Sequence, residues 1–342
     1  MNNSVIFITI FLTSLVLTIA CTRILIPIIT SKKYGQKILE CGPNWHKKKE
    51  GTPTMGGLGF IIPIIICFIL FFFILRTENQ TREFLCTLNV LIYAVLNALI
   101  GIIDDLAKIR KKQNEGLTPL KKFIFQSVAA ILFLVSFKLS VGIDTSIVIP
   151  FTDIRLELGF MFYILAFFVL CGFVNAVNLT DGIDGLASLI TLTISVLFLA
   201  LSLTIDSAPL LFFSASGLGA MLGFLIFNFH PAKIFMGDTG SLFLGAIVVS
   251  YSFISNNILL VILYGFVFFC EAMSDIVQVV YFKLSKGKRI LKMAPLHHHF
   301  EKCGWSEVKI VSIFSVVNLM FCVLAYLSAV KLWVWYMASE GK

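Results

Sequence analysis

Five polar clusters interrupt an otherwise apolar chain, and together they contain the residue types that chemistry on a phosphate group requires. They occupy residues 47–57, 101–108, 175–185, 228–241 and 293–301. Five aspartates, several lysines, glycine-rich turns and a run of three histidines are gathered there. Carboxylate oxygens suit Mg²⁺, whereas lysines and glycine-rich turns suit a polyanion. Because Mg²⁺ and cations around a phosphate are the apparatus of phosphoryl transfer, the clusters favour that class of reaction.

The aspartate pair Asp104 and Asp105 stands at the end of an apolar run and is followed by Lys108. We expect the pair to lie at the C-terminal end of a helix, where the helix dipole is unfavourable for anions. Helix capping therefore does not account for these carboxylates. Two interpretations stay open for these carboxylates: solvated loop residues, or a functional role as a metal ligand or a base.

Two further clusters place aspartates between apolar segments. Asp181 and Asp184 are interleaved with asparagines such as Asn175 and have no basic neighbour in the sequence. An ordinary turn does not explain that pattern, and charges at membrane depth are usually functional. Asp238 precedes an expected helix, so an N-cap is the alternative to a metal ligand there.

The first and last clusters supply cations. The lysines at 47–49 suit either a phosphate or the anionic head groups of lipids. The histidines at 297–299 lack the i, i+4 spacing of a zinc site on a helix, and no cysteine cluster accompanies them. We expect these imidazoles to donate hydrogen bonds to phosphate oxygens instead.

The elements that position these clusters are expected to be membrane-spanning helices. The 342 residues are 58% hydrophobic and 13% charged, with a mean hydropathy of +0.95, whereas a soluble domain is about a quarter charged. A spanning helix needs about 20 apolar residues. The segments that qualify are 4–29, 55–75, 85–103, 122–141, 158–177, 184–204, 208–228, 241–255, 257–281 and 309–330. The sequence thus predicts an all-α integral membrane protein of about ten transmembrane helices in a single domain, residues 1–342, with a short extramembrane hairpin at 147–158.

The basic residues predict the orientation of these helices. Twenty Lys and Arg residues fall in the loops of one face and five in those of the other. Basic loops are cytoplasmic, so both termini are expected outside and the five polar clusters at the cytoplasmic face of the cytoplasmic (inner) membrane. The net charge of +8 does not indicate nucleic acid, because the charges lie in short loops between apolar runs.

The order of the motifs resembles a known family. GTPTMGG, GxxDDxxK, NxxNLTDGxDGL, FMGDTGSL and MAPLHHHFE look like the polyprenyl-phosphate N-acetylhexosamine-1-phosphate transferases. GTPTMGG and MAPLHHHFE are most similar to the members that transfer phospho-N-acetylmuramoyl-pentapeptide. The resemblance covers residues 45 to 301 and implies a reaction of UDP-N-acetylmuramoyl-pentapeptide with undecaprenyl phosphate that gives lipid I and UMP, with Mg²⁺ as cofactor. A homodimer is included among the expected assemblies.

The resemblance also implies roles for individual residues. Asp238 would be the principal magnesium ligand, with Asp181 as a second one. The residues implied in catalysis are Asp104, Asp105, Asp238, Lys108, Lys122 and His297. Those implied in substrate binding are Lys49, Asn175, Asp181, Gly182, Ile183, Asp184, Asn228, Phe235, His298 and His299, with Phe235 stacking on uracil.

Three alternatives are distinguishable from this interpretation. A sister transferase that uses UDP-N-acetylglucosamine would share the aspartate motifs but not the histidine run. A transporter should hold its carboxylates near the middle of the bilayer, and a structural scaffold for cell-wall assembly needs no aspartate cluster. Within the favoured reaction we expect single displacement, in which Asp104 assists the lipid phosphate and Asp105 orients the metal or the acceptor, although these two assignments could be reversed.

Overall fold

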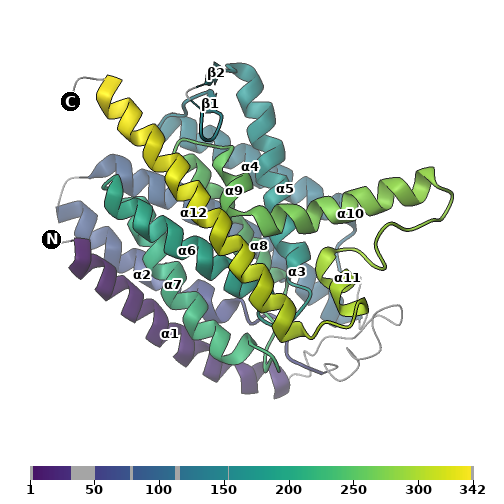
Figure 1. Cartoon of the computed structure of the whole chain (residues 1–342). Coiled ribbons are helices and arrows are strands. Elements are labelled where there is room, and N and C mark those ends of the chain that lie inside the picture. Colours follow the sequence, from purple (N-terminus) through teal and green to yellow (C-terminus); the bar gives the residue numbers. More distant parts are fainter. Residues whose placement is uncertain (1–2, 32–50, 78–79, 112–115, 153, 340–342) are drawn as a thin grey trace.

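The chain folds into a bundle of long helices with one small β-hairpin (Figure 1). The computed structural model describes residues 3–31, 51–77, 80–111, 116–152 and 154–339. The long helices are α1 (Asn3–Ser31), α2 (Leu58–Thr77), α3 (Thr81–Lys111), α4 (Pro119–Ser140), α5 (Phe160–Thr180), α6 (Leu186–Thr204), α7 (Ala208–Asn228), α8 (Gly237–Ile254), α10 (Phe266–Leu284) and α12 (Glu307–Ser339). Two short helices, α9 (Leu260–Tyr264) and α11 (Leu296–Lys302), complete the helical elements of the described residues.

Eight of these helices are long and apolar enough to cross a membrane, which confirms the prediction of an all-α membrane protein. They are α1, α3, α4, α5, α6, α7, α8 and α12. The apolar stretch of α2, Leu58–Phe73, is shorter. The predicted continuous helix over 257–281 is wrong, because the chain breaks at Gly265 into α9 and α10.

The hairpin lies between α4 and α5, where the sequence predicts it. Strands β1 (Ser146–Val148) and β2 (Arg155–Glu157) pair antiparallel, with Ile147 opposite Leu156. In Figure 1 the start of α1 and the end of α12 lie at the same end of the bundle. That arrangement agrees with an even number of crossings.

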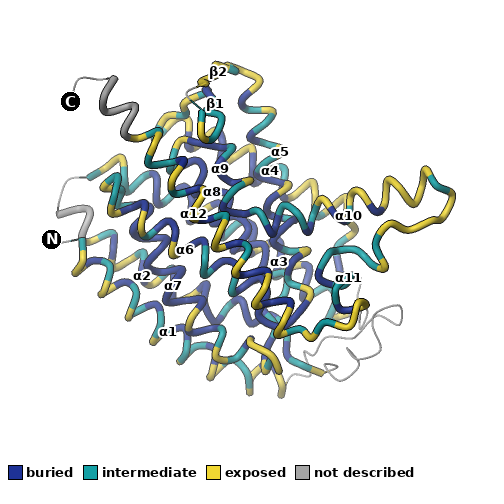
Figure 2. The backbone as a smooth tube through the Cα atoms, viewed as in Figure 1, coloured by how far each residue is buried: buried dark blue, intermediate teal, exposed yellow. Residues whose placement is uncertain are grey.

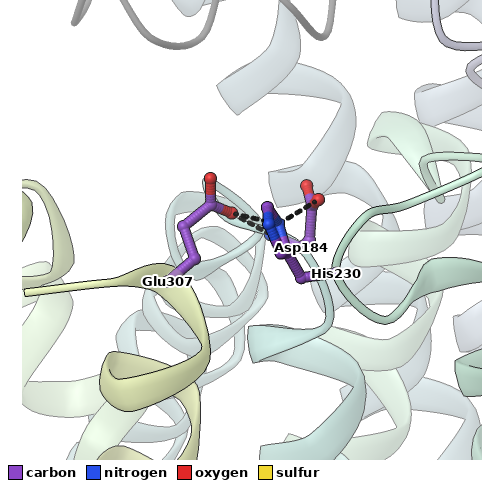
Figure 3. A group of neighbouring side chains, drawn as sticks. All are labelled: Asp184, His230 and Glu307. Atoms are coloured by element: carbon purple, nitrogen blue, oxygen red, sulfur yellow. Dashed lines mark hydrogen bonds and ion pairs between the residues drawn. The ribbon is translucent and has the colours of Figure 1, made fainter.

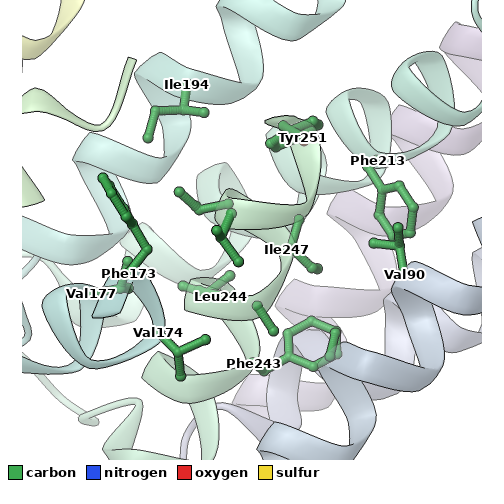
Figure 4. Close-up of a cluster of buried hydrophobic side chains, with 14 of the residues drawn as sticks. Val90, Phe173, Val174, Val177, Ile194, Phe213, Phe243, Leu244, Ile247 and Tyr251 are labelled. Atoms are coloured by element: carbon green, nitrogen blue, oxygen red, sulfur yellow. The ribbon is translucent and has the colours of Figure 1, made fainter. Parts of the chain in front are cut away.

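Helix α8 is the centre of the bundle. In its most apolar stretch of 18 residues, 83% of the residues are buried, whereas the share is 28% in the corresponding stretch of α1 at the periphery. Figure 4 shows its Phe243, Leu244 and Ile247 surrounded by apolar side chains, among them Val174 of α5 and Phe213 of α7. Because lipid is as apolar as these side chains, close packing is what holds such helices together.

Glycines let the central helices approach one another. A Cβ atom at Gly101 of α3 would overlap the backbone carbonyl of Asp238 at the start of α8. A Cβ atom at Gly57 would likewise overlap the backbone of Gly240. Both glycines therefore bring polar clusters that are distant in sequence to the first turn of α8.

Exposed positions line the outer faces of the bundle (Figure 2), and many of them are large apolar residues, as expected of surfaces that contact lipid. Helix α10 points away from the bundle after the break at Gly265. A buried asparagine on α12 satisfies backbone groups at that break. The Asn318 side chain accepts the backbone N–H of Val267 (3.3 Å) and donates to the carbonyl of Tyr264 (3.1 Å).

Candidate active site

The first turn of α8 gathers polar and charged residues of three other helices around Asp238. One carboxylate oxygen, Oδ2, accepts from the ammonium groups of Lys122 (2.9 Å) on α4 and Lys108 (3.0 Å) on α3. The other oxygen, Oδ1, accepts from the amide of Asn178 (2.9 Å) near the end of α5. Asp238 does not cap α8 with its side chain, so the N-cap alternative does not describe it.

Asp105 is the residue that caps α8. Its Oδ2 accepts the backbone N–H and the hydroxyl of Thr239, at 2.9 and 2.7 Å, and its Oδ1 accepts the backbone N–H of Asp238 at 3.2 Å. The expectation that Asp104 and Asp105 close their helix is wrong, because α3 continues to Lys111 beyond the apolar run. Asp105 caps a neighbouring helix whose N-terminal dipole favours an anion, which the sequence of α3 alone does not reveal.

Asp104 is buried beside its neighbour, with 3% of its surface exposed. Its Oδ1 accepts the backbone N–H of Leu117 (2.7 Å), and its Oδ2 lies 2.6 Å from the ammonium of Lys108. Both oxygens therefore have partners, and Lys108 bridges Asp104 to Asp238.

Three carboxylates converge closely enough to hold a metal ion. One oxygen each of Asp104, Asp105 and Asp238 lies within 4.8 Å of the other two. Hard oxygen ligands of this kind suit Mg²⁺ better than a soft metal. Asp181, predicted as a second metal ligand, is outside this group. It is nonetheless close enough that burial, together with the charges of Asp238 and Asp105, raises the pKa of its carboxyl well above the usual range.

The glycine-rich segment 51–57 pairs its backbone with the loop that precedes α8. The backbone N–H of Phe235 donates to the carbonyl of Pro53 (2.9 Å), and the N–H of Gly56 donates back to the carbonyl of Phe235 (2.8 Å). The paired glycines thus accommodate the chain's own backbone, whereas the sequence interpretation assigned their close approach to a phosphate. Lys49, in the same motif, lies outside the described residues.

Comparison with known proteins identifies the family to which this arrangement belongs. Residues 87–256, which hold Asp104, Asp105 and Asp238, match the model of glycosyl transferase family 4. A phospho-N-acetylmuramoyl-pentapeptide-transferase of Clostridium acetobutylicum is 44% identical over 89% of this chain and 93% of its own length. A second, from Staphylococcus aureus, is 43% identical over 90% of this chain and 95% of its own length.

The chain belongs to the phospho-N-acetylmuramoyl-pentapeptide-transferase family. A third relative, from Halalkalibacterium halodurans, carries the same name and is 40% identical over 95% of this chain and 98% of its own length. The family predicted from the order of the motifs is thereby confirmed.

In this transferase, two of the predicted asparagines have structural partners. Asn175 exchanges hydrogen bonds with Gln126 of α4, at 2.8 and 3.4 Å. Asn228 accepts from Ser188 (2.9 Å) and donates to the carbonyl of Ile234 (3.0 Å), next to Phe235. Asn228 therefore shapes the loop that presents Phe235.

Asp184 joins a second polar cluster that ties three segments together (Figure 3). Its Oδ2 lies 3.0 Å from Nδ1 of His230 and accepts the backbone N–H of Ala232 at 3.0 Å. The backbone N–H of Asp184 donates to Glu307, the first residue of α12, at 3.2 Å. This cluster fixes the loop 181–185 against the loop before α8.

The three predicted histidines contact three different partners, because successive residues of α11 point in different directions. His297 lies against Glu271 of α10, His298 lies 2.6 Å from Glu301, and His299 accepts the backbone N–H of Lys292 at 3.0 Å. Of the three, His297 borders Gly182, where an added Cβ would overlap its Nε2. Ile183 beside Gly182 is buried.

The sequence interpretation missed three residues of the site, Asn178, Thr239 and Glu271. Asn178 lies three residues after Asn175 on α5, and this spacing puts the two side chains on the same face of the helix, so the sequence already indicated that Asn178 faces the site wherever Asn175 does. Thr239 is part of the same motif as Asp238. Glu271 lies in an apolar segment, and a carboxylate in such a segment is itself a functional signal.

Proposed function

We propose that this chain transfers phospho-N-acetylmuramoyl-pentapeptide from UDP-N-acetylmuramoyl-pentapeptide to undecaprenyl phosphate, forming lipid I and UMP for peptidoglycan biosynthesis. The observation that carries the proposal is the cluster of Asp104, Asp105 and Asp238 with Lys108 and Lys122 at one end of the membrane helices. The relatives, 40–44% identical over most of the chain, are named for this transfer. A site at the end of spanning helices suits one lipid substrate and one water-soluble substrate.

The residues present fit a magnesium ion, and we assign Asp238 as its principal ligand. Asp105 is the least suitable of the three carboxylates, because three hydrogen bonds, from the backbone N–H groups of Asp238 and Thr239 and from the Thr239 hydroxyl, commit it to capping α8. Asp104 and Asp181 are the candidates for the second ligand. When bound, Mg²⁺ would neutralise charge on the pyrophosphate of the donor.

The chain's own residues supply the remaining functions. Lys108 and Lys122 place two positive charges beside Asp238, where they can stabilise negative charge that develops on phosphate oxygens. The acceptor phosphate is already largely ionised near neutral pH, since its second pKa is about 6, and it needs little activation. Asp104, buried with both oxygens engaged, is suited to positioning the acceptor and poorly suited to attacking the donor. We therefore infer single displacement.

The remaining roles follow the sequence interpretation. Phe235 is assigned to stack on uracil, next to Gly182 and Ile183, and Lys49 and the residues His298 and His299 are assigned to the donor. The excess of basic residues around the site end of the bundle supports a cytoplasmic site with ten crossings and both termini outside. A homodimer in the cytoplasmic membrane is part of the same proposal.

The decisive experiment identifies the lipid product. The purified protein in detergent is incubated with undecaprenyl phosphate, Mg²⁺ and either UDP-N-acetylmuramoyl-pentapeptide or UDP-N-acetylglucosamine. We expect lipid I by mass spectrometry, with UMP and no UDP by chromatography, from the first donor alone. A lipid product from UDP-N-acetylglucosamine alone would assign the chain to the sister activity instead.

A further inference from the structure

The β-hairpin between α4 and α5 exposes apolar side chains at the end of the bundle opposite the carboxylate cluster (Figure 1). Phe151, Ile154 and Leu156 are 45%, 50% and 45% exposed. The hairpin contacts α12 at Ser328, whereas α12 begins at Glu307, next to the site. The hairpin therefore takes no part in the proposed reaction, and its exposed apolar surface needs another explanation.

The two faces of the hairpin differ in character. Successive residues of a strand point to opposite faces, so Ile154 and Leu156 lie on one face and Arg155 and Glu157 on the other. The guanidinium of Arg155 lies 2.9 Å from a carboxylate oxygen of Asp144 and 3.4 Å from one of Glu157, so the charges of this second face compensate one another. The hairpin is thus amphipathic, with one apolar face and one charged face.

Phe151 lies at the tip of the hairpin, at a position that usually requires glycine. The backbone N–H of Thr152 donates to the carbonyl of Ile149 at 3.1 Å, with Pro150 and Phe151 between them, and the φ of Phe151 is 65°. Proline at the second position and a positive φ at the third are typical of a type II turn, in which glycine is favoured at the third position because a positive φ strains larger residues. Phe151 therefore carries a conformational cost that glycine would avoid, and strain of this kind is characteristic of positions with a function.

Helix α12 holds this strained turn in place. The backbone N–H of Phe151 donates to the hydroxyl of Ser328 at 3.3 Å, and the ammonium of Lys331 donates to the carbonyl of Phe151 at 3.2 Å. Ser328 is completely buried on α12, which is one of the helices long and apolar enough to span a membrane. The half-exposed ring of Phe151 is therefore fixed in position relative to a spanning helix.

The exposed apolar surface of the hairpin leads directly to that of α5. Strand β2 ends at Glu157, and the apolar span of α5 begins at Phe160. Phe160, Ile164 and Phe168 recur every four residues and are 76%, 39% and 62% exposed, so they form an apolar stripe along a helix that contacts lipid. The hairpin therefore lies where α5 enters the membrane, and the lipid that covers α5 can also cover the apolar face of the hairpin.

We propose that the hairpin is an interfacial membrane anchor, in which Phe151, Ile154 and Leu156 insert among the phospholipids of the leaflet at this end of the bundle. A two-stranded hairpin leaves backbone groups unpaired at its outer edges, and such groups need water or lipid head groups. The anchor therefore lies at the boundary between head groups and acyl chains, where aromatic rings are enriched and charged side chains reach water. It holds the connection between α4 and α5 and the end of α12 at one depth in the membrane.

Photo-crosslinking identifies what contacts the tip. The full chain with Phe151→p-benzoylphenylalanine is purified, reconstituted into vesicles of phosphatidylethanolamine and phosphatidylglycerol, irradiated, and measured as the intact protein by mass spectrometry. Phe168→p-benzoylphenylalanine on the lipid-facing stripe of α5 is the positive control. Glu157→p-benzoylphenylalanine on the charged face of the hairpin is the matched negative control. We expect an adduct of the protein with one phospholipid at positions 151 and 168, and loss of that adduct at position 157.

The other outcomes would overturn the anchor. A phospholipid adduct at position 168 but not at 151 would show that the tip lies in water, and a crosslink from position 151 to a second copy of the chain would make the tip a contact between copies. Equal phospholipid adducts at positions 151 and 157 would contradict the orientation of the two faces. If the Phe151 variant does not elute from gel filtration as the wild type does, Ile154→p-benzoylphenylalanine on the apolar face takes its place, with the same adduct expected.

Discussion

The residues of the site are of two kinds. Those of the first kind place a charged group where a substrate can contact it, and those of the second kind hold residues of the first kind in position. Asp238, Lys108 and Lys122 belong to the first kind, since their charged atoms meet at 2.9–3.0 Å. Asp105 belongs to the second, because it caps α8 and so fixes the direction of Asp238. The adjacent aspartates of α3, Asp104 and Asp105, therefore have different structural roles, although the sequence alone does not distinguish them.

Asp238→Asn tests the first kind of residue. The amide keeps the hydrogen bond to Lys122 but removes the charge, and losing a group that stabilises charge costs about 10²-fold or more in rate. We expect turnover to fall by at least that factor, measured as release of UMP, with an unchanged elution profile in detergent. Asp144→Asn is the control, because Asp144 pairs with Arg155 in the hairpin region. Near-normal activity of Asp238→Asn would exclude Asp238 as the principal metal ligand.

Asp181→Asn tests the crowding of negative charge. Because the pKa of Asp181 is raised in the folded protein, its ionised form is disfavoured there relative to the unfolded chain. The resulting destabilisation is absent below the unfolded pKa of about 3.9 and develops as pH rises through the folded pKa. In the presence of EDTA, Asp181→Asn should therefore stabilise the protein at pH 8 and have little effect near pH 4. Thermal unfolding at the two pH values measures this, and equal effects at both would contradict it.

At the scale of elements, the break between α9 and α10 shows where sequence reasoning stops. Hydropathy is continuous across residues 257–281, so a single helix was the natural prediction. The break is supported by Asn318, which lies on another helix and supplies hydrogen bonds to Val267 and Tyr264. Because Asn318 lies about 50 residues after the break, the sequence around Gly265 alone does not predict it. In contrast, the convergence of Asp104 with Asp238 was predictable, because alternating spans place their loops on the same face.

Asn318→Leu should weaken this junction. The substitution leaves the buried N–H of Val267 unsatisfied, at a cost of about 1–3 kcal/mol, and leaves the Tyr264 carbonyl only the weak hydrogen bond from the Cys322 thiol, so we expect a lower melting temperature. Ser315→Ala on the same helix is the matched control, because the buried Ser315 hydroxyl makes no hydrogen bond within the described chain. A melting temperature equal to that of the control would show that the junction does not depend on Asn318.

At the scale of the whole molecule, the bundle is polarised. The carboxylate cluster, the cluster of Asp184 with Glu307 and the start of α12 share one end, and α12 finishes at the other, where α1 begins. Loops at the site end hold most of the lysines. A water-soluble donor that is made in the cytoplasm could reach the site only if that end faces the cytoplasm, so orientation is part of the function.

Cysteine labelling in intact cells tests the orientation. In a Cys303→Ser background, which removes the one exposed cysteine of the described residues, Lys288→Cys places a thiol in the loop between α10 and α11, and Gly142→Cys places one in the turn after α4. The positive-inside rule predicts that a membrane-impermeant maleimide labels Gly142→Cys in intact cells and Lys288→Cys only after permeabilisation. Gly142 faces open space, so a side chain there meets no neighbour, although its positive φ of 90° makes the substitution mildly strained. Labelling of Lys288→Cys from outside would show that the molecule has the opposite orientation. The donor would then have to enter from the other side of the membrane.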